Sequence, residues 1–393
     1  MRTKCKFRHS VALVIPGSFK KGPKATELYY LSKGISRVGQ KVVIYSLDSE
    51  SWIEGDLFIK GLFSPVSKIL RALMFMNNVI PFPFSLRLTA EIIFDQLIAA
   101  LLPQQHSVVV VLPRLVKVAE QAKRFGAVTV LYGAMASPGY NLQLICKEPF
   151  VEGRLKMMIK FHHKQMKYID HVLALSTFSA KTYMRDGIPP THIHVTPLGV
   201  NRDNFESRKT YPSKCRFLFI ANMQGLKGES YLLKAWEKAG LDKSKAELII
   251  CGRACGSIYR QIMSLQRRYK NVHYMGYVEK EKVIEQYRQS SVFVFPTLSE
   301  GMPKVVLEAM SCGLPVISTP VVEGLVEDGI NGFLVNFRDI DSLADRLWWF
   351  VNNPESIPRM GHHSLEIVRR YTWENFELAV EESFRRIIKL GER

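Results

Sequence analysis

Short apolar runs alternate along this chain with longer segments of helical periodicity, and this alternation constrains the fold more than any other feature. Between the first two runs, residues 24–38 repeat apolar side chains at helical spacing and end before Gly39. Strands that are apolar throughout and joined by helices form parallel sheets covered on both faces. The sequence therefore predicts an α/β protein with strands at 11–15, 41–46, 108–112, 128–131 and 172–175.

A polar stretch at 201–213 interrupts the alternation, which then starts again. The second series of apolar runs predicts strands at 217–220, 247–251, 292–295 and 315–318. Because 393 residues suffice for two domains, we expect two doubly wound parallel sheets rather than one large sheet. The predicted domains are residues 1–205 and 206–371. A last helix with Thr372 as its N-cap is expected to return residues 372–393 to the first domain.

The chain carries a formal net charge of +18, from 54 Lys and Arg against 36 Asp and Glu. Its hydrophobic fraction of 47% excludes wholesale disorder, so the charge belongs to a folded protein. Residues 1–205 hold 27 basic and 13 acidic side chains, whereas residues 206–393 hold 27 and 23. An excess of cations indicates an anionic partner such as a nucleic acid, a membrane surface or a phosphorylated substrate. We expect the first half to meet that partner.

The sequence also predicts where the protein works. No apolar stretch approaches the ~18 residues of a membrane span, and six scattered cysteines suit reduced thiols. The apolar run at 11–15 is too short for a signal peptide. We therefore expect a cytoplasmic protein, either free or peripheral on the inner face of the membrane. Residues 66–80 and 153–169 combine apolar stripes with basic side chains, as in membrane-facing helices or in ordinary core-packing helices.

The segment 296–315 carries the most informative chemistry, because it follows a predicted strand and opens a helix after Gly301. A helix N-terminus after a glycine turn binds anions, since unpaired N–H groups and the helix dipole face the ligand. Glu300 in the loop and Glu308, about two turns into the helix, could accept hydrogen bonds from hydroxyl groups of a sugar or a ribose. Taken singly, Glu300 could equally cap the helix and Glu308 could be solvated.

This segment resembles the family 4 glycosyltransferases, which are retaining enzymes of the GT-B fold with nucleotide-sugar donors. The resemblance rests on Glu300-x7-Glu308 in its flanking sequence. It is dense from about residue 170 to residue 350 and includes the segments 195–200, 219–228, 272–278 and 324–335. It implies two facing Rossmann-like domains, of which the first binds the acceptor and the second binds the donor.

The resemblance also implies roles for single residues. Glu300 would contact hydroxyls of the transferred sugar, and Glu308 would contact the ribose. Lys227 would neutralise the leaving diphosphate, on which negative charge develops as the glycosidic bond breaks. Gly17 would let the backbone of the first domain approach that diphosphate. The remaining implied donor contacts are those of Tyr277 and Val278 near the nucleobase and of the backbone amides of Gly301, Met302 and Lys304 with the diphosphate.

Two positions depart from the family pattern. Asn222 stands where many members carry an Arg, and Lys304 or Arg253 could supply the missing cation. Ser137 stands where many members carry a His in the first domain. These departures keep open a second hypothesis, a catalytically silent binder of nucleotide sugars.

On the acceptor side, Lys20, Lys21 and Lys24 follow the first strand and would ring the mouth of the cleft, with Ser137 nearby. The resemblance implies a retaining hexosyltransferase that moves a sugar from a nucleotide-diphosphate sugar to a glycan or lipid-linked acceptor. Synthesis of cell-envelope polysaccharide or glycolipid is the expected setting. The charge of the first half would then serve an anionic acceptor or the membrane that carries it.

Two further hypotheses start from single features of the sequence. The string Asp339-Ile-Asp341 matches a metal-binding pattern of other glycosyltransferases, but it precedes a helix. We therefore interpret Asp341 as a helix N-cap and predict a reaction that needs neither metal nor cofactor beside the nucleotide sugar. The high net charge suggests a nucleic-acid-binding protein, yet the basic half carries no motif for DNA or RNA, so we predict no nucleic-acid partner.

Overall fold

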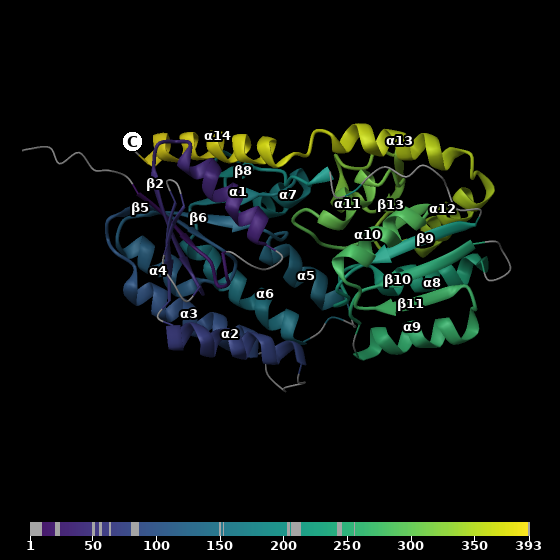
Figure 1. Cartoon of the computed structure of the whole chain (residues 1–393), viewed down its shortest axis with the longest axis horizontal. Helices are drawn as coiled ribbons and strands as arrows, with labels where there is room; N and C mark the ends of the chain where they lie inside the picture. The colour runs from purple at the N-terminus through teal and green to yellow at the C-terminus, as the bar shows by residue number, and fades with distance from the viewer. Residues whose placement is uncertain are drawn as a thin grey trace, which may run out of the picture.

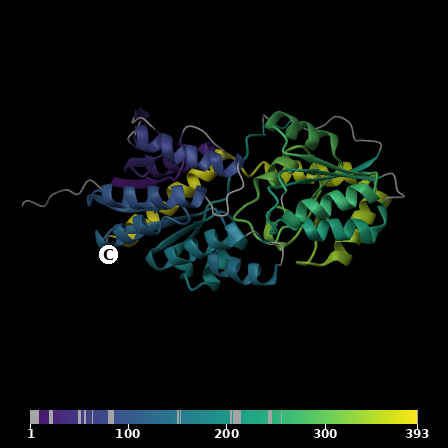
Figure 2. The same cartoon turned by 90° about the horizontal axis from the view of Figure 1, so that it is seen from below.

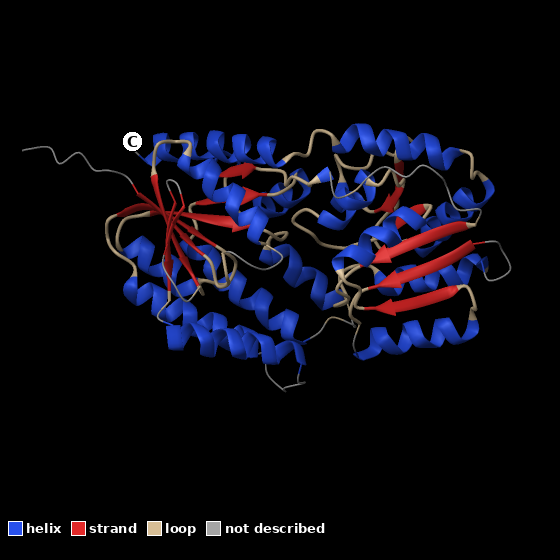
Figure 3. Ribbon diagram, in the orientation of Figure 1, coloured by secondary structure: helices blue, strands red, loops and turns tan. Residues whose placement is uncertain are grey.

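A computed structural model describes residues 10–19, 24–48, 52–54, 57–62, 64–79, 86–148, 151, 153–202, 205, 214–241, 246–254 and 256–391 (Figure 1). These residues form two sheets, each surrounded by helices (Figure 3). Within the described ranges, no helix is both long and apolar enough to span a membrane. The predicted acceptor-side residues Lys20 and Lys21, and most of the polar stretch 201–213, lie outside the described residues.

The first sheet has eight strands in the order β3-β4-β2-β1-β5-β6-β7-β8. All neighbouring strands are parallel except β3 and β4, which are antiparallel. All five residues of β1 are buried, as expected of an apolar strand between two layers of helices. The strands are β1 (Ser10–Val14), β2 (Lys41–Ser46), β3 (Trp52–Glu54), β4 (Leu57–Gly61), β5 (His106–Val111), β6 (Val128–Gly133), β7 (His171–Ala174) and β8 (Ile193–Val195).

Helices cover both faces of the first sheet (Figures 1 and 3). Helix α1 lies on one face, and α2, α3 and α4 lie on the other (Figure 1). The helices of this half are α1 (Ala25–Ser36), α2 (Ser64–Val79), α3 (Leu86–Leu101), α4 (Val116–Arg124), α5 (Pro138–Lys147), α6 (Gly153–Gln165) and α7 (Thr177–Arg185), with short 3₁₀ turns at Met166–Tyr168 and Pro190–His192.

The second sheet has six strands in the order β11-β10-β9-β12-β13-β14, and all its neighbouring strands are parallel. Its strands are β9 (Cys215–Ile220), β10 (Ala246–Cys251), β11 (Val272–Gly276), β12 (Val292–Phe295), β13 (Val316–Ser318) and β14 (Gly332–Leu334). Its helices are α8 (Glu229–Ala239), α9 (Gly256–Arg268), α10 (Lys280–Gln289), α11 (Lys304–Ser311), α12 (Ile340–Asn352) and α13 (Ser356–Val368), with a 3₁₀ turn at Pro320–Val322.

The last helix, α14 (Trp373–Gly391), returns to the first sheet and packs along α1 (Figures 1 and 2). Thr372 is its N-cap, as predicted, because the Thr372 hydroxyl accepts a hydrogen bond of 3.0 Å from the Asn375 N–H. At the crossing, a Cβ on Gly34 of α1 would lie 2.7 Å from Val380, so only a glycine allows this approach. Arg37, just after α1, adds an ion pair of 2.6 Å with the buried Glu377.

The structure confirms the predicted fold class of two doubly wound parallel sheets. The predicted strands at 41–46 and 292–295 match β2 and β12 to the residue. One capping prediction was wrong, because Asp339 rather than Asp341 caps α12. The Asp339 carboxylate accepts hydrogen bonds from the Ser342 N–H (2.9 Å) and hydroxyl (2.7 Å), whereas Asp341 pairs with Lys238. The exact boundaries of the two domains remain predictions.

Candidate active site

The strand order of each sheet reverses at one point, between β1 and β5 in the first sheet and between β9 and β12 in the second. Ligands of doubly wound sheets bind outside the carboxyl ends of the strands at such a point. The loops after β9 and β12 carry Lys227 and Glu300, and the loops after β1 and β5 carry Gly17 and Arg114. Strand order thus places the predicted site residues where a ligand is expected.

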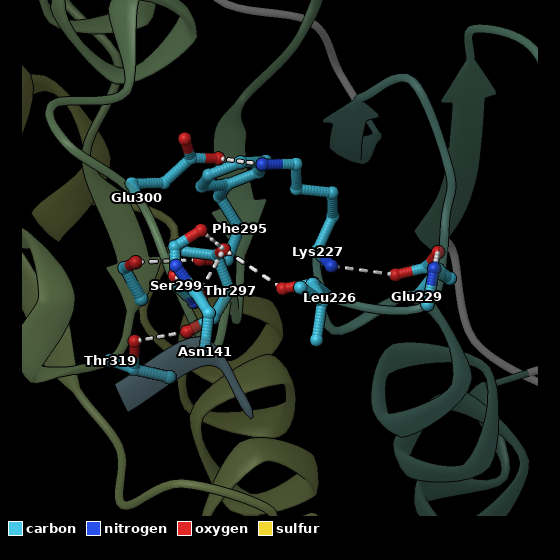
Figure 4. Close-up of polar contacts among 11 residues, drawn as sticks. Asn141, Leu226, Lys227, Glu229, Phe295, Thr297, Ser299, Glu300 and Thr319 are labelled. Carbon is cyan, nitrogen blue, oxygen red and sulfur yellow. Dashed lines mark hydrogen bonds and ion pairs between the residues drawn. The ribbon is translucent and has the colours of Figure 1, made fainter. Parts of the chain in front are cut away.

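Lys227 and Glu300 form an ion pair in which Lys227 Nζ lies 2.5 Å from Glu300 Oε1 (Figure 4). The two side chains are 24% and 17% exposed, so one end of the pair is open to a ligand. Each group neutralises the other. An anion that binds the Lys227 ammonium would therefore release the Glu300 carboxylate to accept other hydrogen bonds.

The loop that carries Lys227 is fixed by Glu229, the first residue of α8. The Glu229 carboxylate accepts hydrogen bonds from the N–H groups of Gly225 (2.6 Å) and Lys227 (2.9 Å). Burial raises the pKa of Glu229, and these N–H groups act against that shift. Gly228 has φ +77°, and a Cβ there would lie 1.9 Å from the Pro296 carbonyl oxygen. The position requires glycine because the two site loops touch there.

The loop that carries Glu300 is bonded to the Lys227 loop and to the first half of the chain (Figure 4). The Leu226 carbonyl accepts hydrogen bonds from the Leu298 N–H (2.9 Å) and the Thr297 hydroxyl (3.1 Å). The Ser299 hydroxyl donates a hydrogen bond of 2.6 Å to Asn141 Oδ1, which belongs to α5. Both catalytic candidates are thus held by backbone and buried polar contacts that do not involve their own charged ends.

The turn between Glu300 and α11 lies against the first half of the chain. The Gly301 carbonyl accepts a hydrogen bond of 2.6 Å from the Ser176 hydroxyl, and the Met302 sulfur accepts one of 3.1 Å from the Leu198 N–H. A Cβ on Gly301 would lie 2.6 Å from the carbonyl carbon of Ala134. The amides expected to hold a diphosphate therefore lie where the two halves meet.

The structure decides between the alternative roles of the two glutamates. Helix α11 begins at Lys304 with Pro303 in the capping position, and no side chain caps it, so Glu300 is not a helix cap. Glu308 Oε2 accepts a hydrogen bond of 3.0 Å from the hydroxyl of Tyr287, a fully buried side chain. Glu308 is thus an anchored, half-buried carboxylate rather than a freely solvated one.

A cavity of about 310 Å³ opens between the two halves at this point. Its lining includes side chains of both signs, and the predicted site residues among them are Lys24, Asn222, Lys227, Glu300, Met302 and Lys304. Gly17 lines a neighbouring cavity of about 340 Å³ in the first half, whose lining also includes Lys24. Seven of the predicted site residues therefore lie around two adjoining cavities, whereas Tyr277, Val278, Gly301, Glu308 and Ser137 line neither.

The predicted nucleobase residues have a more open setting. Tyr277 is 67% exposed, and the Arg253 guanidinium lies 5.0 Å from the centre of its ring, within the range of a cation–π contact. Val278 is half-buried. Asn222 is exposed and lines the cavity together with Lys304, whereas Arg253 lies over Tyr277. Of the two cations expected to replace the family Arg, Lys304 is the one in the cavity lining.

Glu27 in the first turn of α1 is a site residue that the sequence analysis missed. It is 2% exposed, and it accepts a hydrogen bond of 2.7 Å from the Tyr132 hydroxyl. Its other oxygen lies 3.1 Å from Lys304 Nζ, so it links the first half of the chain to the start of α11. Its two partners lie 105 and 277 residues away along the chain, so no local pattern marked it.

Lys24 itself is a strongly perturbed cation. Burial lowers the pKa of its ammonium group, the carboxylate of Glu27 opposes that shift, and the cations of Arg114, Lys304 and Arg87 add to it. Lys24 thus stands among groups of its own sign. Sites of this kind are often functional, because an anionic ligand relieves the repulsion.

The expectation that Ser137 faces the acceptor was wrong. Ser137 is fully buried and is the N-cap of α5: its hydroxyl accepts a hydrogen bond of 3.3 Å from the Tyr140 N–H. Its own N–H donates a hydrogen bond of 2.8 Å to the Thr182 hydroxyl. Among the described residues, no group of three His, Cys, Asp or Glu side chains is placed to hold a metal ion.

Comparisons with known proteins agree with this geometry. Residues 214–353 match the family model of the glycosyl transferases group 1. An uncharacterized glycosyltransferase of Methanocaldococcus jannaschii is 24% identical over 279 residues, which cover 60% of this chain and 69% of that protein. The O-antigen chain mannosyltransferase B of Escherichia coli is 24% identical over 247 residues, 58% of this chain and 64% of that protein. The chain thus covers less than two thirds of this second relative's length.

Solved structures match the whole chain at low sequence identity. Sucrose-phosphate synthase of Thermosynechococcus elongatus superposes with a TM-score of 0.69 at 16% identity and covers 98% of this chain and 100% of its own. HepE of Anabaena, in complex with UDP and glucose, superposes with a TM-score of 0.63 at 13% identity. This match covers 97% of this chain and 100% of HepE. The fold is GT-B, and the match over residues 214–353 supports a glycosyltransferase.

Proposed function

We propose that this protein is a retaining glycosyltransferase that moves a sugar from a nucleotide-diphosphate sugar to a glycan or lipid-linked acceptor. The observation that carries the proposal is the ion pair of Lys227 and Glu300, which lies at the switch point of the second sheet and lines a cavity shared with the first half. The match of residues 214–353 to the glycosyl transferases group 1 supports it. The structure of HepE, which has a similar fold and binds UDP and glucose, also supports the proposal.

The ion pair is the starting point of the proposed mechanism. The donor diphosphate takes the place of Glu300 on the Lys227 ammonium. Backbone N–H groups of Gly301, Met302 and Lys304 and the dipole of α11 hold the same phosphates. Negative charge grows on the diphosphate as the glycosidic bond breaks, and a fixed cation at that oxygen lowers the barrier. Lys227 and the start of α11 would supply the cationic groups for this step.

Glu300 then serves the transferred sugar. Once Lys227 binds phosphate, the Glu300 carboxylate is free to accept hydrogen bonds from sugar hydroxyls and fix the ring in the cavity. Glu308, held by Tyr287, would bind the ribose hydroxyls from inside α11. The acceptor would enter from the first half and attack on the face that the diphosphate leaves, which retains the anomeric configuration.

The setting of the reaction follows from the charge and the relatives. The basic first half suits an anionic acceptor at the inner face of a membrane, and the mannosyltransferase relative acts on an O-antigen chain by its name. We therefore propose a role in the synthesis of cell-envelope polysaccharide or glycolipid, by a hexosyltransferase that needs no metal.

A second candidate function is a catalytically silent binder of nucleotide sugars. Asn222 and the buried Ser137 favour it, because both stand where many relatives carry a functional side chain. To separate the two functions, the full chain is incubated with a panel of nucleotide-diphosphate sugars, with and without a crude lipid-linked acceptor. The proposed enzyme releases nucleoside diphosphate from one donor and forms a product whose anomeric proton, by NMR, has the donor's configuration. Binding of a donor without any release over many hours would instead identify the silent binder.

A further inference from the structure

The first half of the chain holds a second cavity of about 340 Å³, lined by groups to which the proposed donor mechanism gives little part. It lies between the loop after β1, the loop after β5, α2 and the start of α3. Lys24 and Ala134 line this cavity and also the donor cavity, so the two adjoin at that wall. A molecule in the first cavity would thus face the sugar held by the second domain.

Three cations line the first cavity: Lys24, Arg87 and Arg114. A single carboxylate in the lining, Glu91, opposes them, and it is 3% exposed. Arg114 Nε lies 2.7 Å from Glu91 Oε2, and one terminal nitrogen of Arg114 lies 3.1 Å from Glu91 Oε1. Arg87 Nε lies 3.1 Å from that same oxygen. Among the described lining residues, Glu91 is thus shared by the two arginines, while the nearby Glu27 carboxylate, outside this lining, opposes the charge of Lys24.

Glu91 orients the Arg114 guanidinium without using all its donors. Burial would raise the pKa of Glu91, but the charges of Arg114 and Arg87 lower it, so it is a carboxylate. A guanidinium carries five N–H donors, and the two bonds to Glu91 occupy two of those on Arg114. Arg114 is 13% exposed, which leaves it reachable from the cavity.

The backbone at Arg114 is built to keep this side chain in place. Arg114 has φ +83°, a left-handed conformation that non-glycine residues rarely adopt. Its N–H donates a hydrogen bond of 2.7 Å to Oε1 of the fully buried Gln165. The Gln165 amide in turn donates to the carbonyls of Leu112 (3.0 Å) and Leu115 (3.1 Å). Strain of this kind persists where the surroundings fix it, and it collects at ligand sites.

The remaining wall of the cavity is apolar. Leu28, Met74, Phe75 and Leu112 line it, and Phe75 is 68% exposed at its edge. A ligand that fits therefore has an anionic group for the three cations and an apolar portion for this wall. A phosphate suits the cations better than a single carboxylate, because its several oxygens can accept from two guanidinium groups and an ammonium together.

We propose that this cavity is the acceptor site and that the acceptor carries a phosphate ester, which binds among Lys24, Arg87 and Arg114 while its neighbouring apolar group lies against Met74 and Phe75. The inference rests on the proposed function and names the acceptor class. The phosphate ester belongs to a lipid carrier, because a soluble sugar phosphate has no apolar group for this wall. Its attacking hydroxyl would point across the wall shared by Lys24 and Ala134 toward the donor sugar.

Calorimetry on the full chain tests the proposal with three probes: octyl phosphate, glycerol 3-phosphate and octyl glucoside. Octyl phosphate carries both features, glycerol 3-phosphate lacks the chain, and octyl glucoside lacks the phosphate. We expect octyl phosphate to bind one site per chain at least tenfold more tightly than octyl glucoside. Octyl phosphate should also bind more tightly than glycerol 3-phosphate, and the reverse order would indicate a soluble acceptor and overturn the apolar part of the proposal.

Two variants locate the bound phosphate. Arg87→Gln and Arg114→Lys should each weaken octyl phosphate binding about tenfold while leaving nucleoside diphosphate binding and the melting temperature within error. Arg71→Gln removes an exposed cation of α2 that does not line the cavity, so it should change nothing. Lys227→Met should have the opposite effect: it should weaken nucleoside diphosphate binding and leave octyl phosphate binding unchanged.

The proposal is overturned if octyl glucoside binds as tightly as octyl phosphate or if Arg87→Gln and Arg114→Lys leave phosphate binding unchanged. It is also overturned if Lys227→Met abolishes phosphate binding, because the probe would then occupy the donor site. A chain that binds phosphate probes in this cavity but turns over no nucleotide sugar would refute the proposed function and leave the phosphate site standing.

Discussion

At the scale of single residues, Lys227 and Glu300 pair with each other in the structure. If a donor diphosphate takes the place of Glu300 on that ammonium group, as proposed, the two residues should have opposite effects on nucleotide affinity. Removal of Lys227 takes away a charged partner of the phosphates, whereas removal of the Glu300 charge takes away a competitor. This opposition distinguishes the pair from two independent contacts.

Lys227→Met should weaken the binding of the preferred nucleoside diphosphate about 10- to 100-fold, because a hydrogen bond to a charged group contributes about 1.5–3 kcal/mol. Glu300→Gln should leave that affinity unchanged or raise it, although it abolishes sugar transfer. Titration calorimetry measures both. Lys270→Met, which removes an exposed lysine, is the matched control. Equal losses of affinity in the Lys227 and Glu300 variants would contradict the exchange.

Residues close to the family motif could be predicted from the sequence, and their partners across the cavity could not. Glu300 and Lys227 lie in short sequence motifs whose residue types indicate their chemistry. Glu27 and Asn141 lie in the first half, more than 150 residues from Lys304 and Ser299, their partners in the second half. Nothing local marks Glu27 or Asn141, because their roles arise only when the two sheets face each other.

At the scale of elements, α5 joins the two halves by polar contacts along its length. The Tyr140 hydroxyl donates a hydrogen bond of 3.0 Å to the Leu298 carbonyl. Glu148, just after the helix, accepts hydrogen bonds of 3.0 and 3.1 Å from the Tyr231 hydroxyl and one of 2.8 Å from Arg338 Nε. The same helix thus supports the Glu300 loop at one end and α8 at the other.

The edge of the first sheet between β7 and β8 carries three neighbouring histidines. The rings of His171 and His192 are 4.5 Å apart, and His194 Nε2 lies 3.3 Å from His171 Nδ1. The pKa values of both His171 and His194 are lowered to about 4, chiefly by burial and in addition by the neighbouring histidines. Arg386 of α14 contributes to the shift of His194, and Asp170 opposes that of His171.

The lowered pKa values of the histidines at this edge predict that the folded protein loses stability in mild acid. A histidine with a folded pKa near 4 binds fewer protons than its unfolded form, with a pKa near 6.5, so acid favours the unfolded chain. Between pH 7 and pH 5 one such histidine lowers the free energy of unfolding by about 2 kcal/mol. Urea titrations at both pH values measure the change. His194→Gln should reduce the pH dependence, and the exposed His362→Gln should not; equal pH dependence in the wild type and His194→Gln would contradict the assignment.

The alternation of apolar runs and helical segments predicted the two sheets, because the local sequence of a long buried strand is enough to indicate its conformation. The strands it missed are short or lie toward the sheet edges: β3, β4, β8, β11 and β14. A strand of three residues such as β14 has too few positions to show a period, and it forms only because β13 offers a partner. Tertiary pairing, rather than local sequence, determines these edges.

At the scale of the whole molecule, the two halves differ in charge and meet over the site. Residues 1–205 carry 14 more basic than acidic side chains, and residues 206–393 carry 4 more. The first half contributes Lys24, Arg87 and Arg114 to one cavity. The second half contributes the cations Lys227 and Lys304 to the other. The net charge of the chain is therefore mainly a property of the first half, the half proposed to bind the acceptor.

Gly301 tests whether close contact between the halves matters for activity. A Cβ at this position would lie 2.6–2.9 Å from the backbone of Ala134 and Met135, so Gly301→Ala should force the halves apart. We expect a larger radius of gyration by X-ray scattering and at least a tenfold loss of turnover. The free energy of unfolding should change by less than about 1 kcal/mol, because each half keeps its core. Gly153→Ala, where a Cβ meets nothing within 4 Å, is the control; normal turnover in Gly301→Ala would contradict the expectation.

The central claim is that this chain transfers sugar with Lys227 and Glu300. The most direct measurement is release of nucleoside diphosphate by the full chain with its preferred donor, for the wild type, Lys227→Ala and Glu300→Ala. Lys270→Ala and Glu374→Ala, both at exposed positions, serve as matched controls. The account predicts turnover in the wild type and in both controls, and a loss of at least a hundredfold in each site variant. Wild-type rates in either site variant would contradict it.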